Sequence, residues 1–212
     1  MTASITDLAS DVEGIYREID GKIDALRSAT GLGCPPGCGR CCWHPDVVAT
    51  VVEVIPFALE VWEQGREEFI LELLEEKAEK EDSVCVAFRP DPDDLDKGRC
   101  EWYPQRPLMC RLFGFAARRG KQNRIEVAPC RILKDHDPGP YEEAQAVIDA
   151  GLDVPIYTDY SMRASCSDPG LGLPALHINL AIRRALEHVY WKRRQGSEAA
   201  PDALGRPPRV PE

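Results

Sequence analysis

Four cysteines fall within nine residues of the chain, in the stretch CPPGCGRCC at residues 34–42. Cys34, Cys38 and Cys41 follow the spacing C-x3-C-x2-C, and Cys42 comes directly after them. Thiolates that are so close in a loop rich in Pro and Gly can converge on a metal ion or on an iron–sulfur cluster. We therefore expect this loop to bind metal.

The adjacent pair Cys41–Cys42 complicates a simple site. Neighbouring side chains diverge by about 180° in a strand and by about 100° in a helix, so the two thiols do not easily serve one tetrahedral ion together. The pair indicates either two adjacent sites or one ligand beside a free thiol.

More cysteines follow among Pro, Gly and aromatic residues. Together with the loop they make eight candidate metal ligands, which would fill two four-cysteine sites: Cys34, Cys38, Cys41, Cys42, Cys85, Cys100, Cys110 and Cys130. Buried, inert thiols are the alternative, because cysteine is a common core residue. The density of thiols in an irregular loop argues against that alternative. Cys166 lies apart from the others and is interpreted as a bystander.

Arginines stand directly beside four of these cysteines. A four-thiolate site carries net negative charge, which nearby guanidinium groups would offset while lowering the pKa values of the thiols. The four residues are Arg40, Arg99, Arg111 and Arg131. These arginines and the adjacent cysteine pair suit a multi-atom centre, so we favour iron over Zn²⁺ as the cofactor.

The combined pattern over residues 31–132 resembles the YkgJ-type cysteine-cluster family, whose domain is described as chelating zinc or iron. In that family C-x3-C-x2-C-C is followed by a Gly-x-Cys-x-x-Tyr element and an Arg-Pro-x-x-Cys-Arg element. The matching residues here are Gly98, Cys100, Tyr103, Arg106, Pro107, Cys110 and Arg111. The chain departs from the family at Cys85, which stands in VCVAFRP, and at Cys166 in ASCSD.

Other interpretations of the cluster stay open. The same C-x3-C-x2-C spacing holds the cluster of radical S-adenosylmethionine enzymes, but Arg40 stands where those enzymes have an aromatic residue. Flagellin lysine N-methylases carry a similar cysteine cluster, so a metal-dependent enzyme or redox protein is one possible function. A non-catalytic module whose metal replaces a hydrophobic core is the other. His44 is a further candidate ligand beside the loop, and the aromatic residues Trp102, Tyr103, Phe113 and Phe115 are expected to surround the site.

The sequence and its composition limit the cellular compartment and the classes of partner that we expect. The first twenty residues lack a basic segment followed by an apolar run, so we expect a cytoplasmic protein with no membrane association. Cytoplasmic thiols stay reduced, which favours metal binding over disulfides. The net charge of −10 argues against a general nucleic-acid binder.

Apolar periodicity predicts a mainly α fold with irregular loops and a few short strands, built as a single small domain around the cysteine site. We expect an amphipathic helix over 1–30, a cysteine-cluster domain over 31–195, and a disordered Pro-rich tail over 196–212. Within the domain, a capping box Thr50–Glu53 predicts a helix to about Trp62. Further helices are predicted over 66–82, 140–151 and 174–194, and loops and short strands over 84–132.

Overall fold

The computed structural model describes residues 4–94, 97–128 and 130–198. The α-helices of this part of the chain are Ile5–Thr30 (α1), Arg40–Trp43 (α2), Ile55–Glu63 (α3), Glu67–Glu79 (α4), Leu108–Leu112 (α5), Arg131–His136 (α6), Pro138–Asp149 (α7), Tyr157–Ser167 (α8) and Ile178–Glu198 (α9). Short 3₁₀ turns occupy Val52–Val54 (η1), Tyr103–Gln105 (η2) and Lys121–Asn123 (η3).

The strands are short and pair antiparallel in twos. They are Val48–Ala49 (β1) with Leu176–His177 (β6), Phe88–Pro90 (β2) with Gly98–Cys100 (β3), and Ala117–Arg119 (β4) with Ile125–Val127 (β5). The expected mainly α architecture with a few short strands is therefore confirmed.

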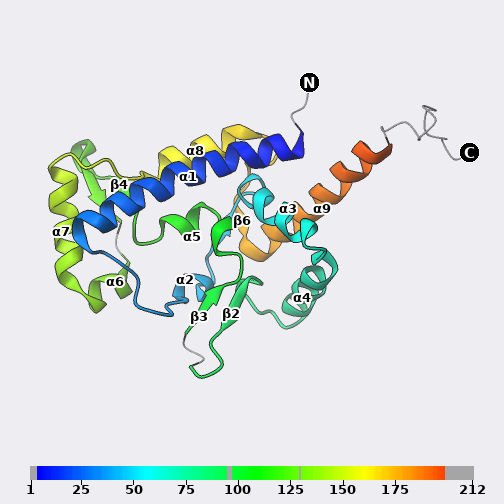
Figure 1. Cartoon of the computed structure of the whole chain (residues 1–212), viewed down its shortest axis with the longest axis horizontal. Helices are drawn as coiled ribbons and strands as arrows, with labels where there is room; N and C mark the ends of the chain where they lie inside the picture. Colours follow the sequence, from blue (N-terminus) through cyan, green and yellow to red (C-terminus); the bar gives the residue numbers. More distant parts are fainter. Residues whose placement is uncertain (1–3, 95–96, 129, 199–212) are drawn as a thin grey trace, which may run out of the picture.

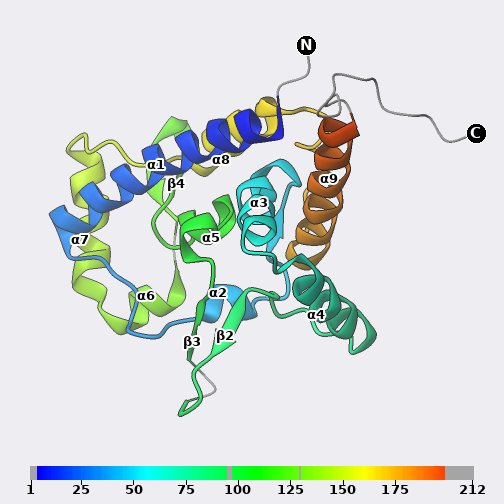
Figure 2. The same ribbon diagram turned by 45° about the vertical axis from the view of Figure 1, so that its right-hand side comes forward.

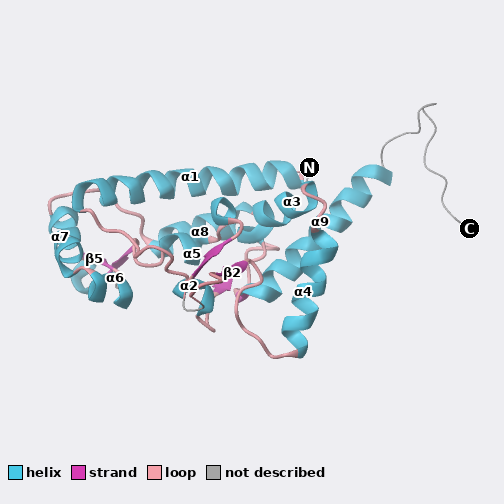
Figure 3. Cartoon of the chain, turned by 60° about the horizontal axis from the view of Figure 1, so that its bottom comes forward, coloured by secondary structure: helices cyan, strands magenta, loops and turns pink. Residues whose placement is uncertain are grey.

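The cysteine-bearing segments lie between two groups of helices. Figure 1 shows α1 running along one side of the molecule with α8 beside it, α6 and α7 near its C-terminal end, and α3, α4 and α9 toward the other end. After a 45° turn, α2 and the β2–β3 hairpin still lie below α5, and the hairpin projects from the lower side of the molecule (Figure 2). The helical groups thus flank the site from both ends, while the strands in Figure 3 form short two-stranded pairings.

Helix α1 forms because one of its faces is apolar over its whole length. Apolar residues at three- and four-residue steps are buried along this face, among them Val12, Ile19 and Leu26. Ser4 caps the N-terminus in a capping box with Asp7, and Gly31 ends the helix at φ 72°. A positive φ is accessible to glycine at little steric cost, so the chain can leave the helix here and enter the cysteine loop.

The predicted capping box at residues 50–53 is also present. The backbone N–H of Thr50 donates to Glu53 Oε1 at 3.1 Å, and the N–H of Glu53 donates to Thr50 Oγ1 at 3.4 Å. The turn η1 comes first and α3 follows, because Pro56 lacks an N–H and fits only in the first turn of an α-helix.

Several elements differ from the sequence-based expectation. The segment 84–132 contains the short helix α5, and α6 begins at Arg131. Helix α8 lies in a region for which we made no prediction. Residues 176–177 pair with β1 before α9 begins, and α9 continues to Glu198. Most of the predicted tail, 199–212, lies outside the described residues.

The core is divided into two clusters of buried side chains. The larger cluster joins α1, α3, α8 and α9 and includes Cys42 and Cys85. The smaller cluster gathers the end of α1 with β4, β5, α6 and α7, and includes Cys130. No helix in the described part of the chain combines the length and apolar character that a membrane-crossing segment needs.

The cysteine loop packs on the β2–β3 hairpin through two glycines. A Cβ at Gly39 would lie 2.5 Å from Phe88 Cε2, and a Cβ at Gly98 would lie 2.3 Å from Phe88 Cζ and 2.5 Å from the backbone oxygen of Arg89. The ring of Phe88 therefore fills the space where both side chains would stand. Trp43 of α2 meets the same ring edge-on at 5.7 Å.

Replacing Gly98 tests this packing. We expect Gly98→Ala to lower the free energy of unfolding by about 1–3 kcal/mol, because the new methyl group overpacks the site against a ring and a backbone oxygen. The control is Gly21→Ala on α1, where a Cβ meets nothing within 4 Å. That variant should stabilise the protein by about 0.5–1 kcal/mol. Urea unfolding measures both, and equal effects would contradict the packing argument.

Candidate metal centre

Five of the eight candidate cysteines line one small cavity in the middle of the molecule. The cavity has a volume of about 50 Å³, and its cysteines are Cys41, Cys42, Cys85, Cys100 and Cys110. They come from α2, from the segment after α4, from β3 and from α5. The two neighbours Cys41 and Cys42 thus face the same space, and residues 34–42 and 85–110 meet there.

The remaining three candidates do not line this cavity and form a second group. Cys34 and Cys38 lie on the loop between α1 and α2, and Cys130 directly precedes α6. The thiols of Cys38, Cys41 and Cys130 all act electrostatically on Cys34. Cys34 is exposed, Cys38 is half-buried and Cys130 is buried. Cys41 therefore stands between the two groups.

Neither group is preformed as a ligand shell. Among residues 4–94, 97–128 and 130–198, no three or more His, Cys, Asp or Glu side chains are arranged to hold one metal ion. The side chain of His44 is 55% exposed and contacts Asp46, outside the cavity. Cys166 is exposed on α8, in a separate groove with Met162. The cysteines share a space, and ligation would require them to draw closer together.

Burial keeps most of these thiols protonated. It raises the pKa of Cys85 to about 12, and it raises the pKa of Cys100 and Cys110 as well. Cys41 differs, because a hydrogen bond from Cys42 and then the charge of Arg106 lower its pKa to about 7. The pKa of Cys42 is raised for the same reason, since it keeps the proton that the pair shares. Several thiolates in so apolar a space would need a cation to offset their charge.

The arginine that faces the thiols is Arg106, and it is not one of the four sequence neighbours. Its charge lowers the pKa of Cys41 and opposes the pKa-raising effect of burial at Cys34, Cys100 and Cys110. Arg131 instead points into solvent with 93% of its side chain exposed. Among the four adjacent arginines, Arg131 therefore does not offset the charge of the thiols, and Arg106 is an arginine that the sequence did not single out for this role.

Arg111 has a structural role instead. Its side chain is 3% exposed, pairs with Asp20 of α1 at 2.5 Å and lies over the ring of Tyr16 at 4.2 Å. The same guanidinium donates to the backbone oxygens of Arg106 and Pro104. Arg111 therefore fixes the turn that precedes α5 against α1, and with it the position of Arg106.

A buried carboxylate fixes the beginning of α5. Glu53 is 5% exposed, and its Oε2 accepts a hydrogen bond from the N–H of Leu108 at 3.2 Å. Its other oxygen accepts from Thr50, as the capping box predicts. Burial raises the pKa of this carboxyl despite these bonds. One side chain thus joins the start of α3 to the helix that carries Cys110.

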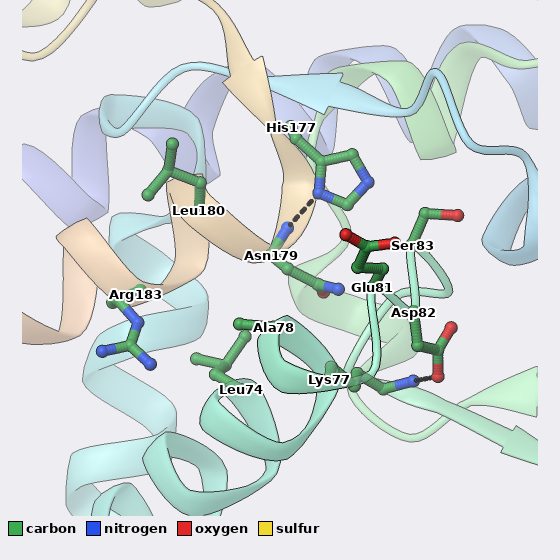
Figure 4. A pocket seen from close by; sticks show the side chains of 10 residues that line it. All are labelled: Leu74, Lys77, Ala78, Glu81, Asp82, Ser83, His177, Asn179, Leu180 and Arg183. Carbon is green, nitrogen blue, oxygen red and sulfur yellow. Dashed lines mark hydrogen bonds and ion pairs between the residues drawn. The ribbon is translucent and has the colours of Figure 1, made fainter.

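The segment around Cys85 is held by Asn179 of α9. The side-chain Oδ1 of Asn179 accepts from the N–H of Val86 at 2.8 Å, and its Nδ2 donates to the C=O of Val84 at 3.0 Å. Figure 4 shows this side chain between His177 and the segment after α4, whose Asp82 pairs with Lys77 of α4. The amide therefore clamps the backbone on both sides of Cys85.

The aromatic residues agree in part with the expectation. Trp102 and Tyr103 line the cysteine cavity, and Trp102 is buried under the guanidinium of Arg66 at 4.7 Å. Phe113 is 41% exposed and Phe115 lines a neighbouring cavity.

Glu101 pairs with Arg66, which precedes α4, and with Arg89 of β2. These ion pairs hold the end of β3 against α4.

Residues 33–132 match the sequence pattern of the CxxCxxCC family, whose description is "Putative zinc- or iron-chelating domain". This match agrees with the resemblance to the cysteine-cluster family that the sequence shows. It contains all eight candidate cysteines, whereas Cys166 lies outside it. Searches of curated proteins and of solved structures gave no match to the chain.

The matched segment has one residue more in its first gap than the name of the CxxCxxCC family prints. Pro35, Pro36 and Gly37 separate Cys34 from Cys38. Gly37 has φ 73°, and its C=O accepts the N–H of Gly98 at 3.0 Å. The three-residue gap therefore includes the glycine that attaches the cysteine loop to the hairpin.

The Asn179 clamp was not visible in the sequence and can be tested directly. We expect Asn179→Ala to lower the free energy of unfolding by about 2–4 kcal/mol, because it leaves two backbone groups without partners. Cys85 of the metal-free protein should also react faster with N-ethylmaleimide. Ser83→Ala, in the pocket that Figure 4 draws around Asn179, is the control and should change stability by less than about 0.5 kcal/mol. Unchanged stability in Asn179→Ala would exclude the clamp.

Proposed function

We propose that the protein binds a metal ion or an iron–sulfur cluster through the cysteines of its CxxCxxCC domain. The observation that carries this proposal is the single cavity lined by Cys41, Cys42, Cys85, Cys100 and Cys110. Thiolates are preferred ligands of both zinc and iron–sulfur centres. The family description, which names zinc and iron, supports the same chemistry.

The surroundings of the cavity suit a thiolate-bound centre. Val54, Phe57, Ile178 and Ile182 form an apolar wall, which would keep water away from the metal. Arg106 supplies a positive charge at the wall, as an anionic thiolate centre requires. Either kind of centre takes four thiolates, so one of the five would be spare; we favour iron over a single Zn²⁺ because the adjacent Cys41–Cys42 pair and the nearby guanidinium suit a multi-atom centre.

The number of centres follows from the position of Cys41. If Cys41 joins Cys34, Cys38 and Cys130, the other four thiols remain for a second site. If Cys41 stays with the cavity cysteines, the three outer thiols support the loop or remain free. We propose one centre in the cavity, because Cys41 lines it and shares a proton with Cys42 there.

A metal-dependent enzyme or redox protein is the second candidate function. It is favoured by a larger cavity, of about 380 Å³, that adjoins the cysteine cavity and includes Cys34 in its wall. A purely structural centre would need no such space beside it. S-adenosylmethionine-linked methylation, as in flagellin lysine N-methylases, is one reaction of this class. We place the protein in the cytoplasm, where its thiols would stay reduced.

Metal content tests the assignment of ligands. Protein purified without added metal should contain iron or zinc, and Cys100→Ser should lose at least half of it because a cavity ligand is removed. Cys166→Ser is the matched control, since that thiol is exposed outside the domain, and it should retain the full content. Elemental analysis and thiol titration measure both. Metal lost from Cys166→Ser but kept by Cys100→Ser would refute the assignment.

Absorbance identifies the type of metal centre, and the metal content of Cys42→Ala reports the number of centres. Anaerobically purified protein should be coloured by thiolate-to-iron charge transfer, whereas a colourless sample containing zinc would overturn the preference for iron.

In Cys42→Ala, a single centre that uses other thiols should keep its full metal content. Loss of half the metal would instead establish two centres.

A further inference from the structure

The 380 Å³ cavity beside the cysteines has the features of a binding site for an organic anion. Its wall includes Ile23, Pro104 and Phe115 together with Cys34. Tyr103 and Arg106 line both this outer cavity and the cysteine cavity. A molecule bound in the outer cavity would therefore lie against the wall of the thiol cluster.

The charges of the outer cavity favour one negative group. Arg111 and Asp20 neutralise each other at 2.5 Å. Arg27 is held loosely by Asp24, with 3.9 Å between the charged atoms and most of both side chains exposed. Arg106 then remains as the excess positive charge, because the cavity has three arginines against two aspartates.

Backbone oxygens and an aromatic ring orient Arg106. Its Nε donates to the C=O of Tyr103 at 2.9 Å, its Nη1 reaches the C=O of Cys110 at 3.4 Å, and its guanidinium lies 3.3 Å from the centre of the Tyr103 ring. Within the part of the chain that the structure describes, no carboxylate pairs with it. These contacts fix the plane of the guanidinium, which is the geometry that recognises a carboxylate.

We propose that the outer cavity binds a small organic monocarboxylate, with its carboxylate on Arg106 and Arg27 and its apolar body against Ile23, Pro104 and Phe115. A carboxylate matches the single excess charge, whereas a doubly charged phosphate exceeds it. The role of this ligand as a substrate or effector of the metal centre rests on the proposed function, whereas its binding does not. Its position next to Cys34 and Arg106 makes it a neighbour of that centre.

The probe is 4-fluorobenzoate, titrated into the full-length protein as purified and followed by ¹⁹F NMR. Saturable binding is expected, and Arg27→Gln should weaken it about five-fold because a hydrogen bond to a charged group is lost. Asp24→Asn should strengthen it about three-fold, because a competing negative charge is removed. Arg131→Gln, on a 93% exposed residue of α6, is the control and should leave it unchanged.

Several results would overturn the site. They are the absence of saturable binding, an affinity that Arg27→Gln leaves unchanged, or tighter binding of inorganic phosphate than of 4-fluorobenzoate. Metal content is measured on the same samples, and Arg27→Gln should keep it because Arg27 lies outside the cysteine cavity. Absence of metal would thus count against the proposed function, while the titration separately decides the carboxylate site.

Discussion

Two backbone hydrogen bonds hold the cysteine loop against the segment that carries the later cysteines. The N–H of Cys85 donates to the C=O of Cys42 at 3.2 Å, and the N–H of Gly98 donates to the C=O of Gly37 at 3.0 Å. The loop has few apolar side chains, so burial alone would not fix its position. These bonds determine which thiols share the cavity, and the packing of Phe88 on two glycines supports them.

The helices that could be predicted are those whose own sequence contains the reason for folding. Helix α1 has an apolar face over its whole length, and α4 is amphipathic between clear boundaries. The short helix α5 has no such pattern in five residues and depends on a distant carboxylate, Glu53, for its first N–H. Isolated helices of that length are unstable, so tertiary contacts determine whether they form. The apolar periodicity of the sequence therefore does not reveal them.

The site was predictable in its chemistry but not in its arrangement. The density of thiols indicated metal binding, and the match over residues 33–132 agrees with it. Which arginine faces the thiols depends on the direction of α5, since Arg111 turns to Asp20 while Arg106 returns toward Cys110. Asn179 lies more than ninety residues from the backbone that it clamps. Nothing local in the sequence records either contact.

Arg106 also connects the two cavities energetically. A thiolate centre is anionic, and the fixed guanidinium in the shared wall would stabilise it. An organic anion in the outer cavity would interact with the same positive charge. Each occupant would therefore reduce the electrostatic stabilisation that Arg106 gives to the other. Such a shared interaction is a coupling free energy, and it must act equally in both directions. With both sites occupied as proposed, the wall formed by Tyr103 and Arg106 would be the place where the thiol centre and the ligand of the neighbouring cavity influence each other.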